Sequence, residues 1–148
     1  MELTRRTLRL VLKEANFHNA WVNQDLVDRM FLLMQKEGGI GLAANQVGER
    51  TRVFVMEIDG KRWTCFNPQV LDYSNDLTEF NEGCLSFKGE TCIIKRPAVI
   101  TVSYYNHSGI EHIETLDGLA ARCFQHELDH LNGITMHDRY KEQNAEKS

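Results

Sequence analysis

The stretch FQHELDH, residues 124–130, contains side chains that can bind a metal ion. On a helix, residues four apart lie on one face, so His126 and His130 can both reach one cation. Glu127 lies at the edge of that face, where it can contact a water on the metal rather than the metal itself. This is the H-E-x-x-H pattern of two neutral imidazole ligands and one general base. Two surface histidines on an ordinary helix are the competing interpretation.

A catalytic site of this kind needs a third protein ligand and an open fourth position. The downstream pattern H-E-x-x-H-x-x-G-x-x-H fits as far as Gly133, but its third histidine would fall on Met136. His137 stands one residue late, about 100° away on a helix. The upstream segment EGCLS, residues 82–86, offers Cys84, whose thiolate is a strong ligand for iron(II) and zinc. A buried structural thiol is the alternative explanation of Cys84.

Two segments could stabilise an oxyanion beside such a metal. The amide of Leu85 could donate to a developing oxyanion, and Gly83 lets the backbone approach a bound group. The segment GIGLAANQ, residues 39–46, is rich in small residues and ends in Gln46. The side-chain N–H of Gln46 could stabilise an oxyanion without competing for the metal. A glycine-rich turn into a buried strand would also explain this segment.

Two helices are expected among the elements that position these groups. Apolar residues at helical spacing predict a helix over residues 24–37, which two glycines end. A second helix is predicted over about residues 118–131, with Asp117 as its N-cap. The polar residues 138–148 are expected to form a solvated or frayed tail.

Extended segments lie between the two predicted helices. Strands are expected at residues 51–58, 62–66 and 68–73, with turns at Gly60 and at Asn67-Pro68. Residues 98–105 and 110–116 flank the turn sequence NHSG and predict a β-hairpin. A helix, several strands and a late helix make an α+β domain. No repeat or linker divides the sequence, so we expect a single domain over residues 1–148.

Composition and charge exclude several classes of protein. The 148 residues suffice for one hydrophobic core, and 42% of them are hydrophobic. A formal charge of −4 gives no basic field for nucleic acids or anionic membranes, and no apolar run approaches a bilayer span. The four cysteines form no C-x-x-C pair and are too sparse for a disulfide framework, which favours a reducing cytosol.

Three motifs together resemble the peptide deformylase family. GIGLAANQ, EGCLS and HELDH stand in the family's order, within a similarity that runs from about Gln24 to Gly133. The resemblance implies antiparallel strands packed around a central metal-binding helix, plus an N-terminal helix. It also implies a metal-dependent amide hydrolase that removes the formyl group from the N-terminal formylmethionine of newly made polypeptides and releases formate.

The family's functional residues map onto this sequence. The resemblance implies one divalent metal ion on Cys84, His126 and His130, with Fe2+ expected in the cell and Ni2+, Co2+ or Zn2+ able to replace it. Glu127 would move a proton from the attacking water to the leaving amine. Gln46 and the Leu85 amide would hold the oxyanion. Residues that would bind the substrate are Ile40, Gly41, Phe80, Gly83, Leu119 and Cys123.

Further positions match or depart from the family pattern. Glu82 is expected to pair with Arg96, and Asp129 to have a helix-surface or hydrogen-bonding role. Arg122 is expected to cover apolar surface with its stem while its head reaches solvent. SFKG replaces the common S-x-P-G, so the loop after Cys84 can differ in stiffness. The N-terminal segment lacks the family's usual proline.

The resemblance implies N-formylmethionyl nascent chains as partners. The protein is expected to act as a monomer in the bacterial cytosol, including that of a phage-infected cell. The short stretch after the late helix leaves a transient ribosome contact open; no nucleic-acid specificity or membrane binding is expected. Two alternatives remain at this point. One is another metallohydrolase or protease that uses HELDH with a ligand other than Cys84. The other is a catalytically idle relative that binds formyl peptides.

Overall fold

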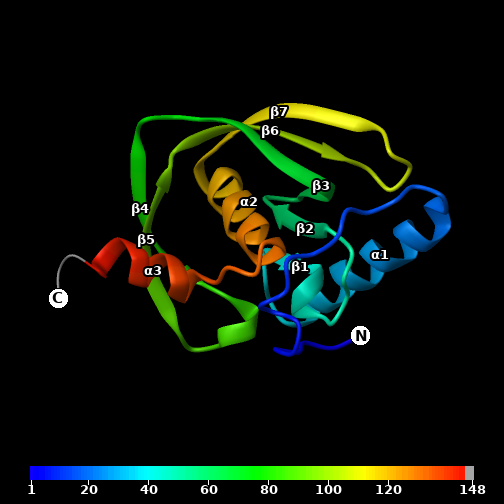
Figure 1. Cartoon of the computed structure of the whole chain (residues 1–148), viewed down its shortest axis with the longest axis horizontal. Helices are drawn as coiled ribbons and strands as arrows, with labels where there is room; N and C mark the ends of the chain where they lie inside the picture. Colours follow the sequence, from blue (N-terminus) through cyan, green and yellow to red (C-terminus); the bar gives the residue numbers. More distant parts are fainter. Residues whose placement is uncertain (146–148) are drawn as a thin grey trace.

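The computed structural model describes residues 1–145, which contain three α-helices, two short 3-10 turns and seven strands. Figure 1 shows helix α2, Gly118–Leu131, at the centre of the molecule, between the larger sheet and the β4–β5 ribbon. Helix α1, Ala20–Lys36, covers one end, and helix α3, Met136–Asn144, lies beside β5. None of the helices within residues 1–145 is long and apolar enough to cross a membrane.

Helix α1 begins four residues before the predicted start. The side chain of Asn19 accepts a hydrogen bond from the Val22 amide at 3.2 Å and so caps the helix. One face of the helix is buried, with Val27, Met30 and Met34 packed into the core. The predicted stop after residue 37 is confirmed, because Glu37 is the C-cap.

The larger sheet has five antiparallel strands in the order β1-β2-β3-β6-β7. Their bounds are Gly41–Ala43, Val53–Ile58, Lys61–Tyr73, Val99–Tyr105 and Glu111–Asp117. The predicted hairpin over residues 98–116 is confirmed as β6 and β7. The segment after β1 forms the 3-10 turn η1, Ala44–Gln46, instead of continuing as a strand.

A second, two-stranded sheet pairs β4, Leu77–Gly83, with β5, Thr91–Pro97. The sequence did not predict these strands, since six of the seven β4 residues are exposed and carry no apolar alternation. The 3-10 turn η2, Leu85–Phe87, follows β4 directly. Cys84 therefore stands between the end of a strand and a tight turn, and not in an irregular loop.

The turn predicted at Asn67-Pro68 is wrong, because β3 runs continuously through both residues. The chain forms a bulge against β6 here, with a register shift between Phe66 and Gln69. Asn67 adopts a left-handed φ of +47°, and its side chain bonds the amide and carbonyl of Ala15 at 2.7 and 3.1 Å. The missing amide of Pro68 is tolerated at such a bulge.

Helix α2 packs its apolar face on the larger sheet. Phe124 is fully buried, and its ring lies edge-on to Phe54 of β2, with 4.9 Å between the centroids. His126 follows two residues later and so points roughly 200° around the helix from Phe124. The predicted bounds of this helix are confirmed, although the Asp117 side chain makes no capping hydrogen bond.

The polar segment predicted to be frayed is helical from Met136 to Asn144; its last residues, 146–148, lie outside the described part of the chain. Thr135 and Asp138 form a reciprocal capping box that starts helix α3. The Gln143 side chain then pairs with both the amide and the carbonyl of Lys95 on β5, at 2.9 and 2.8 Å. These tertiary contacts stabilise a helix whose residues are mostly polar, and no local sequence pattern predicts them.

Asn67→Ala should lower the free energy of unfolding by about 2 kcal/mol, because alanine loses both bonds to Ala15 and is strained at a left-handed φ. Asn67→Gly tolerates that φ and should be less destabilising than alanine. Equilibrium urea unfolding measures both. Asn75→Ala, at an exposed position before β4, is the matched control and should stay within about 0.5 kcal/mol of wild type. An Asn67→Ala protein as stable as that control would contradict the expectation.

Candidate metal centre

Three potential metal ligands meet between β4 and helix α2. Cys84 follows the last residue of β4, and His126 and His130 lie one helical turn apart on α2. One ligand atom from each of the three lies within 4.8 Å of the other two. The Cys84 Sγ atom is 3.3 Å from Nε2 of His130, and the two imidazole centroids are 5.0 Å apart. The predicted upstream ligand is thus beside the helical pair.

Glu82 orients the first histidine. Its Oε1 atom lies 2.8 Å from Nδ1 of His126, and the carboxylate also accepts bonds from Arg96 at 2.6 and 3.0 Å, which confirms the predicted pair. Burial opposes ionisation, but hydrogen bonds from His126 and Arg96 prevail and lower the pKa of Glu82 to about 2. An ionised Glu82 can only accept, so Nδ1 of His126 carries the proton and Nε2 keeps its lone pair for a metal.

The donor set fits a divalent transition metal. His130 is fully buried, and burial together with the neighbouring His126 lowers its pKa well below the ordinary value, which favours the neutral imidazole that ligates metals. A thiol and two imidazoles form the mixed sulfur and nitrogen set that iron(II), zinc, cobalt and nickel accept. His137, the downstream alternative, instead packs against Phe87 and pairs with Glu90.

Glu127 lies beside the ligands as a buried carboxylate. Burial raises its pKa to about 7, and its Oε1 atom has no hydrogen-bond partner among the described residues. The backbone of Gly41 passes so close that a Cβ there would lie 2.5 Å from Oε2 of Glu127 and 2.7 Å from Sγ of Cys123. The small residue predicted at position 41 is therefore required by this close approach.

Gln46 presents its amide nitrogen to the same place. The backbone N–H of Ala43 donates to Oε1 of Gln46 at 2.8 Å, which assigns the opposite end of the amide as Nε2. That nitrogen lies 3.0 Å from the Ser86 hydroxyl and 3.5 Å from Sγ of Cys84. Leu85 begins turn η2, and the first amides of a helical turn have no partner within it. Two neutral N–H donors therefore flank the ligand set.

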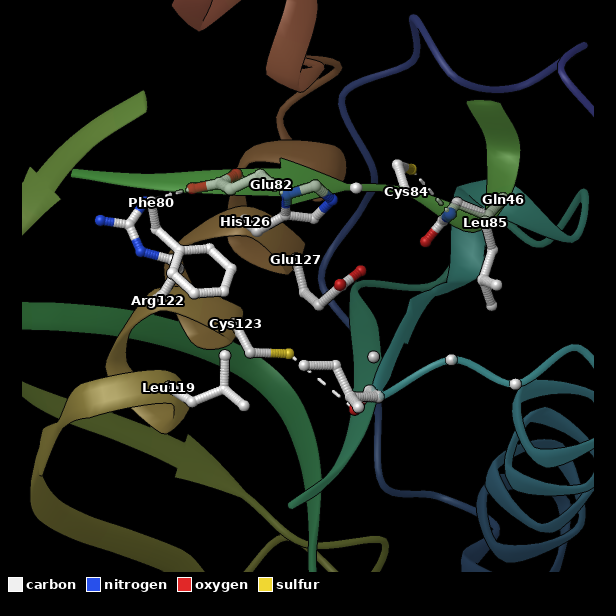
Figure 2. Close-up of a pocket in the computed structure, with 15 residues that line it drawn as sticks. Gln46, Phe80, Glu82, Cys84, Leu85, Leu119, Arg122, Cys123, His126 and Glu127 are labelled. Carbon is white, nitrogen blue, oxygen red and sulfur yellow. Dashed lines mark hydrogen bonds and ion pairs between the residues drawn. The ribbon is translucent and has the colours of Figure 1, made fainter. Parts of the chain in front are cut away.

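These groups line one cavity of about 320 Å³, within the range of ligand pockets. Figure 2 shows the Glu127 carboxylate between Gln46 and Cys84 on one side and Cys123 and Leu119 on the other. Eleven of the twelve predicted site residues line the cavity, namely Ile40, Gly41, Gln46, Phe80, Gly83, Cys84, Leu85, Leu119, Cys123, His126 and Glu127. His130 does not line the cavity.

Arg122 also lines this cavity, and the expectation for its head group is wrong. The guanidinium is buried, where it donates to Glu82 at 2.6 Å, to the Ile94 carbonyl at 3.0 Å and to the Thr78 carbonyl at 2.6 Å. Buried carbonyl and carboxylate acceptors offset the cost of burying this charge. No local sequence signal predicts this contact, because the acceptors lie on β4 and β5, 28 to 44 residues away in the sequence.

Asp129 has the hydrogen-bonding role rather than a surface role. It is buried and accepts bonds from Arg96 at 2.9 Å and from Arg139 of helix α3 at 2.8 and 3.0 Å. Because Arg96 also holds Glu82, these bonds connect helix α3 to the carboxylate that orients His126. The charged network thus spans α3, β5, β4 and α2.

Comparisons with known proteins agree on one family. The sequence model of the Polypeptide deformylase family matches residues 3–146. The peptide deformylase of Agrobacterium fabrum is 40% identical over 118 residues, which cover 76% of this chain and 69% of that protein. The crystal structure of peptide deformylase from Thermotoga maritima superposes with a TM-score of 0.86 at 39% identity, covering 90% of each chain. A peptide deformylase from Synechococcus elongatus, solved in complex with actinonin, gives a TM-score of 0.87 at 35% identity, covering 93% of this chain and 75% of that one.

The Cys/His/His site, together with these matches, defines the class of the protein as a metal-dependent amide hydrolase. Within that class, the chain belongs to the peptide deformylase family. The family and the fold class predicted from the three motifs are confirmed. One alternative was a hydrolase that uses HELDH with a ligand other than Cys84. Among residues 1–145, Cys84, His126 and His130 form the one group of potential metal ligands, so the structure does not support that alternative.

Glu82→Gln should weaken metal affinity about 10- to 100-fold, because the amide holds Nδ1 of His126 less firmly than the carboxylate does. Competition with a chromogenic chelator measures the affinity, and thermal unfolding verifies that the variant is folded. Glu79→Gln makes the same change at an exposed position of the same strand and should leave the affinity unchanged. Wild-type affinity in a folded Glu82→Gln protein would refute this role of Glu82.

Proposed function

We propose that Glu127 is the proton carrier in the hydrolysis of an N-formylmethionyl chain to formate and a free amine. The observation that carries the proposal is the position of this buried carboxylate in one cavity with the Cys/His/His site and two neutral N–H donors. A buried carboxylate with a raised pKa is suited to both accept and return a proton near neutral pH.

The reaction divides between the metal and the side chains. When bound by Cys84, His126 and His130, a divalent metal acts as a Lewis acid and makes water nucleophilic at neutral pH. Glu127 accepts a proton from the water that attacks the formyl carbon. It then delivers this proton to the nitrogen of the breaking C–N bond, which leaves as the amine of methionine. Formate is the other product, so no further reactant is required.

Two donors hold the oxygen on which negative charge develops. The Nε2–H of Gln46 and the N–H of Leu85 lie on the same side of the cavity and carry no formal charge. Their positions are fixed in advance, because Ala43 holds the far end of the Gln46 amide and η2 fixes the Leu85 backbone. Fixed dipoles need no reorientation as the charge forms, which is the source of their catalytic value.

The apolar part of the cavity supports the substrate assignment. Ile40, Phe80 and Leu119 line it, and each exposes between 41 and 51% of its surface, so a ligand can cover them. An unbranched methionine side chain suits such a pocket, with the thiol of Cys123 in its wall. Gly41 begins β1, Gly83 ends β4, and both line the cavity. Their backbone groups can there pair with an extended substrate.

The remaining assignments follow from the chemistry of the site and from its relatives. Iron(II) suits a thiolate and two imidazoles, and nickel, cobalt or zinc can replace it. The substrates are formylated nascent chains, and we infer that the whole chain acts as one domain and as a monomer in a bacterial-type cytosol. A transient ribosome contact would bring the enzyme to those chains.

Formate release from a formyl-Met peptide tests the roles of Glu127 and Gln46. Glu127→Gln should lower kcat at least ~100-fold, since the proton carrier is lost, and Gln46→Ala should lower it about 100- to 1,000-fold. Metal content is measured in each variant so that ligand loss is not mistaken for lost catalysis. Glu142→Gln, on the exposed part of helix α3, is the control for the carboxylate-to-amide change. Fully metallated Glu127→Gln with wild-type kcat would exclude the proposed proton carrier.

Removal and return of the metal tests the cofactor. Chelation should abolish formate release and lower the thermal unfolding midpoint, because a ligand that binds only the folded state stabilises it. Protein handled without oxygen should recover its activity with iron(II) or nickel. Cys84→Ser should bind these metals more weakly, since a hydroxyl is a poorer ligand than a thiolate. Undiminished turnover of the metal-free protein would rule out a metal-dependent reaction.

A further inference from the structure

The η2 turn, Leu85–Phe87, carries the Leu85 amide and the Ser86 hydroxyl that contacts Gln46, so its position decides how well the two N–H donors converge. In this sequence the turn is followed by Lys88, which stands where the family pattern S-x-P-G has proline. The turn therefore lacks one source of backbone stiffness. Other contacts are needed to hold η2 next to η1, the turn that carries Gln46.

Arg5, in the N-terminal segment, contacts the turn in two ways. Its Nε donates to the Ser86 carbonyl at 3.0 Å, and its guanidinium lies over the Phe87 ring, 4.6 Å from the centroid. A planar guanidinium can satisfy a carbonyl and stack on a ring at once, which lysine cannot do. The Phe87 ring also packs edge-on against the ring of His137 of helix α3, with 4.7 Å between the centroids.

The same N-terminal segment is tied to the turn that carries Gln46. The Thr4 amide donates to the Gln46 carbonyl at 2.9 Å, and the Thr7 hydroxyl donates to the Asn45 carbonyl. Residues 4–7 thus bridge η1 and η2, and none of them lines the cavity. Within this bridge Arg5 makes the side-chain contacts to η2.

We propose that Arg5 is a positioning residue for deformylation, which holds η2 so that the Leu85 amide and the Gln46 side chain converge on one oxygen. This inference rests on the oxyanion role proposed above for those two groups. Lys88 pairs with Glu37 at the far end of the turn. Loss of Arg5 therefore loosens the turn without releasing it, and the expected loss of rate is smaller than that for removing a donor.

Kinetics of formate release test the proposal on protein loaded with nickel. Arg5→Gln should lower kcat about tenfold with little change in KM, because misplaced donors weaken binding of the transition state more than of the substrate. Arg5→Lys should recover part of the rate through a bond to the Ser86 carbonyl. Arg6→Gln is the matched control, since Arg6 is exposed and its side chain has no hydrogen bond or ion pair with the described residues.

Two further measurements separate positioning from general stability. Amide hydrogen exchange at Phe87, whose N–H bonds the Cys84 carbonyl at 3.0 Å, should quicken severalfold in Arg5→Gln, while thermal unfolding and nickel affinity match Arg6→Gln. In a Gln46→Ala background, Arg5→Gln should cost less than it does alone, because one of the donors it aligns is gone.

The outcomes are distinguishable. A rate of Arg5→Gln equal to that of Arg6→Gln, while Gln46→Ala is impaired, would overturn the Arg5 proposal and leave the oxyanion role intact. Fully additive losses in the double variant would also overturn it. A Gln46→Ala protein with wild-type kcat would instead refute the oxyanion role, and the Arg5 proposal with it.

Discussion

The hydrogen bonds of the buried Glu82 carboxylate hold the strands and the helix of the site together. The carboxylate accepts hydrogen bonds from Arg96 of β5 and from Arg122 and His126 of α2, and so joins both strands of the small sheet to the central helix. An ionised carboxylate is costly to bury, and the three donors offset that cost only when all are in place. Because Cys84 stands two residues after Glu82, fixing the carboxylate also brings the thiol to the histidines.

The charged network continues beyond Glu82 to the C-terminal helix. Arg96 bonds Glu82 and Asp129, and Asp129 in turn holds Arg139 of helix α3. Alternating charges in a buried chain satisfy one another, whereas any one of them left alone would be destabilising. Helix α3 is therefore part of the scaffold behind the metal centre, although its sequence is polar enough to suggest a solvated tail.

The sequence predicted those parts of the fold and site whose signals are local. Helix α2 was found because its caps, its apolar face and its two ligands all lie within one segment, and the β6–β7 hairpin because NHSG separates two strand-like runs. The sequence did not predict strands β4 and β5, because their exposed or polar residues are stabilised by the pairing of the two strands with each other. Helix α3 was also not predicted, because its polar residues are held by the bond from the Lys95 amide to Gln143 and by the bonds from Arg139 to Asp129. The buried head of Arg122 could not be foreseen either, because its acceptors come from β4 and β5, far away in the sequence.

Two glutamates of the site illustrate how surroundings divide the roles of one side chain. Glu82 receives three charged or polarised donors, and its pKa falls to about 2, so it stays ionised and serves as a fixed acceptor. Glu127, on helix α2, lines the same cavity but has an oxygen without a hydrogen-bond partner among the described residues, and burial raises its pKa to about 7. A carboxylate that is denied donors is more basic and readier to accept a proton than one that is fully hydrogen-bonded. The donors around Glu82 therefore keep it ionised, whereas the proton transfer proposed for Glu127 uses a carboxylate that lacks such donors.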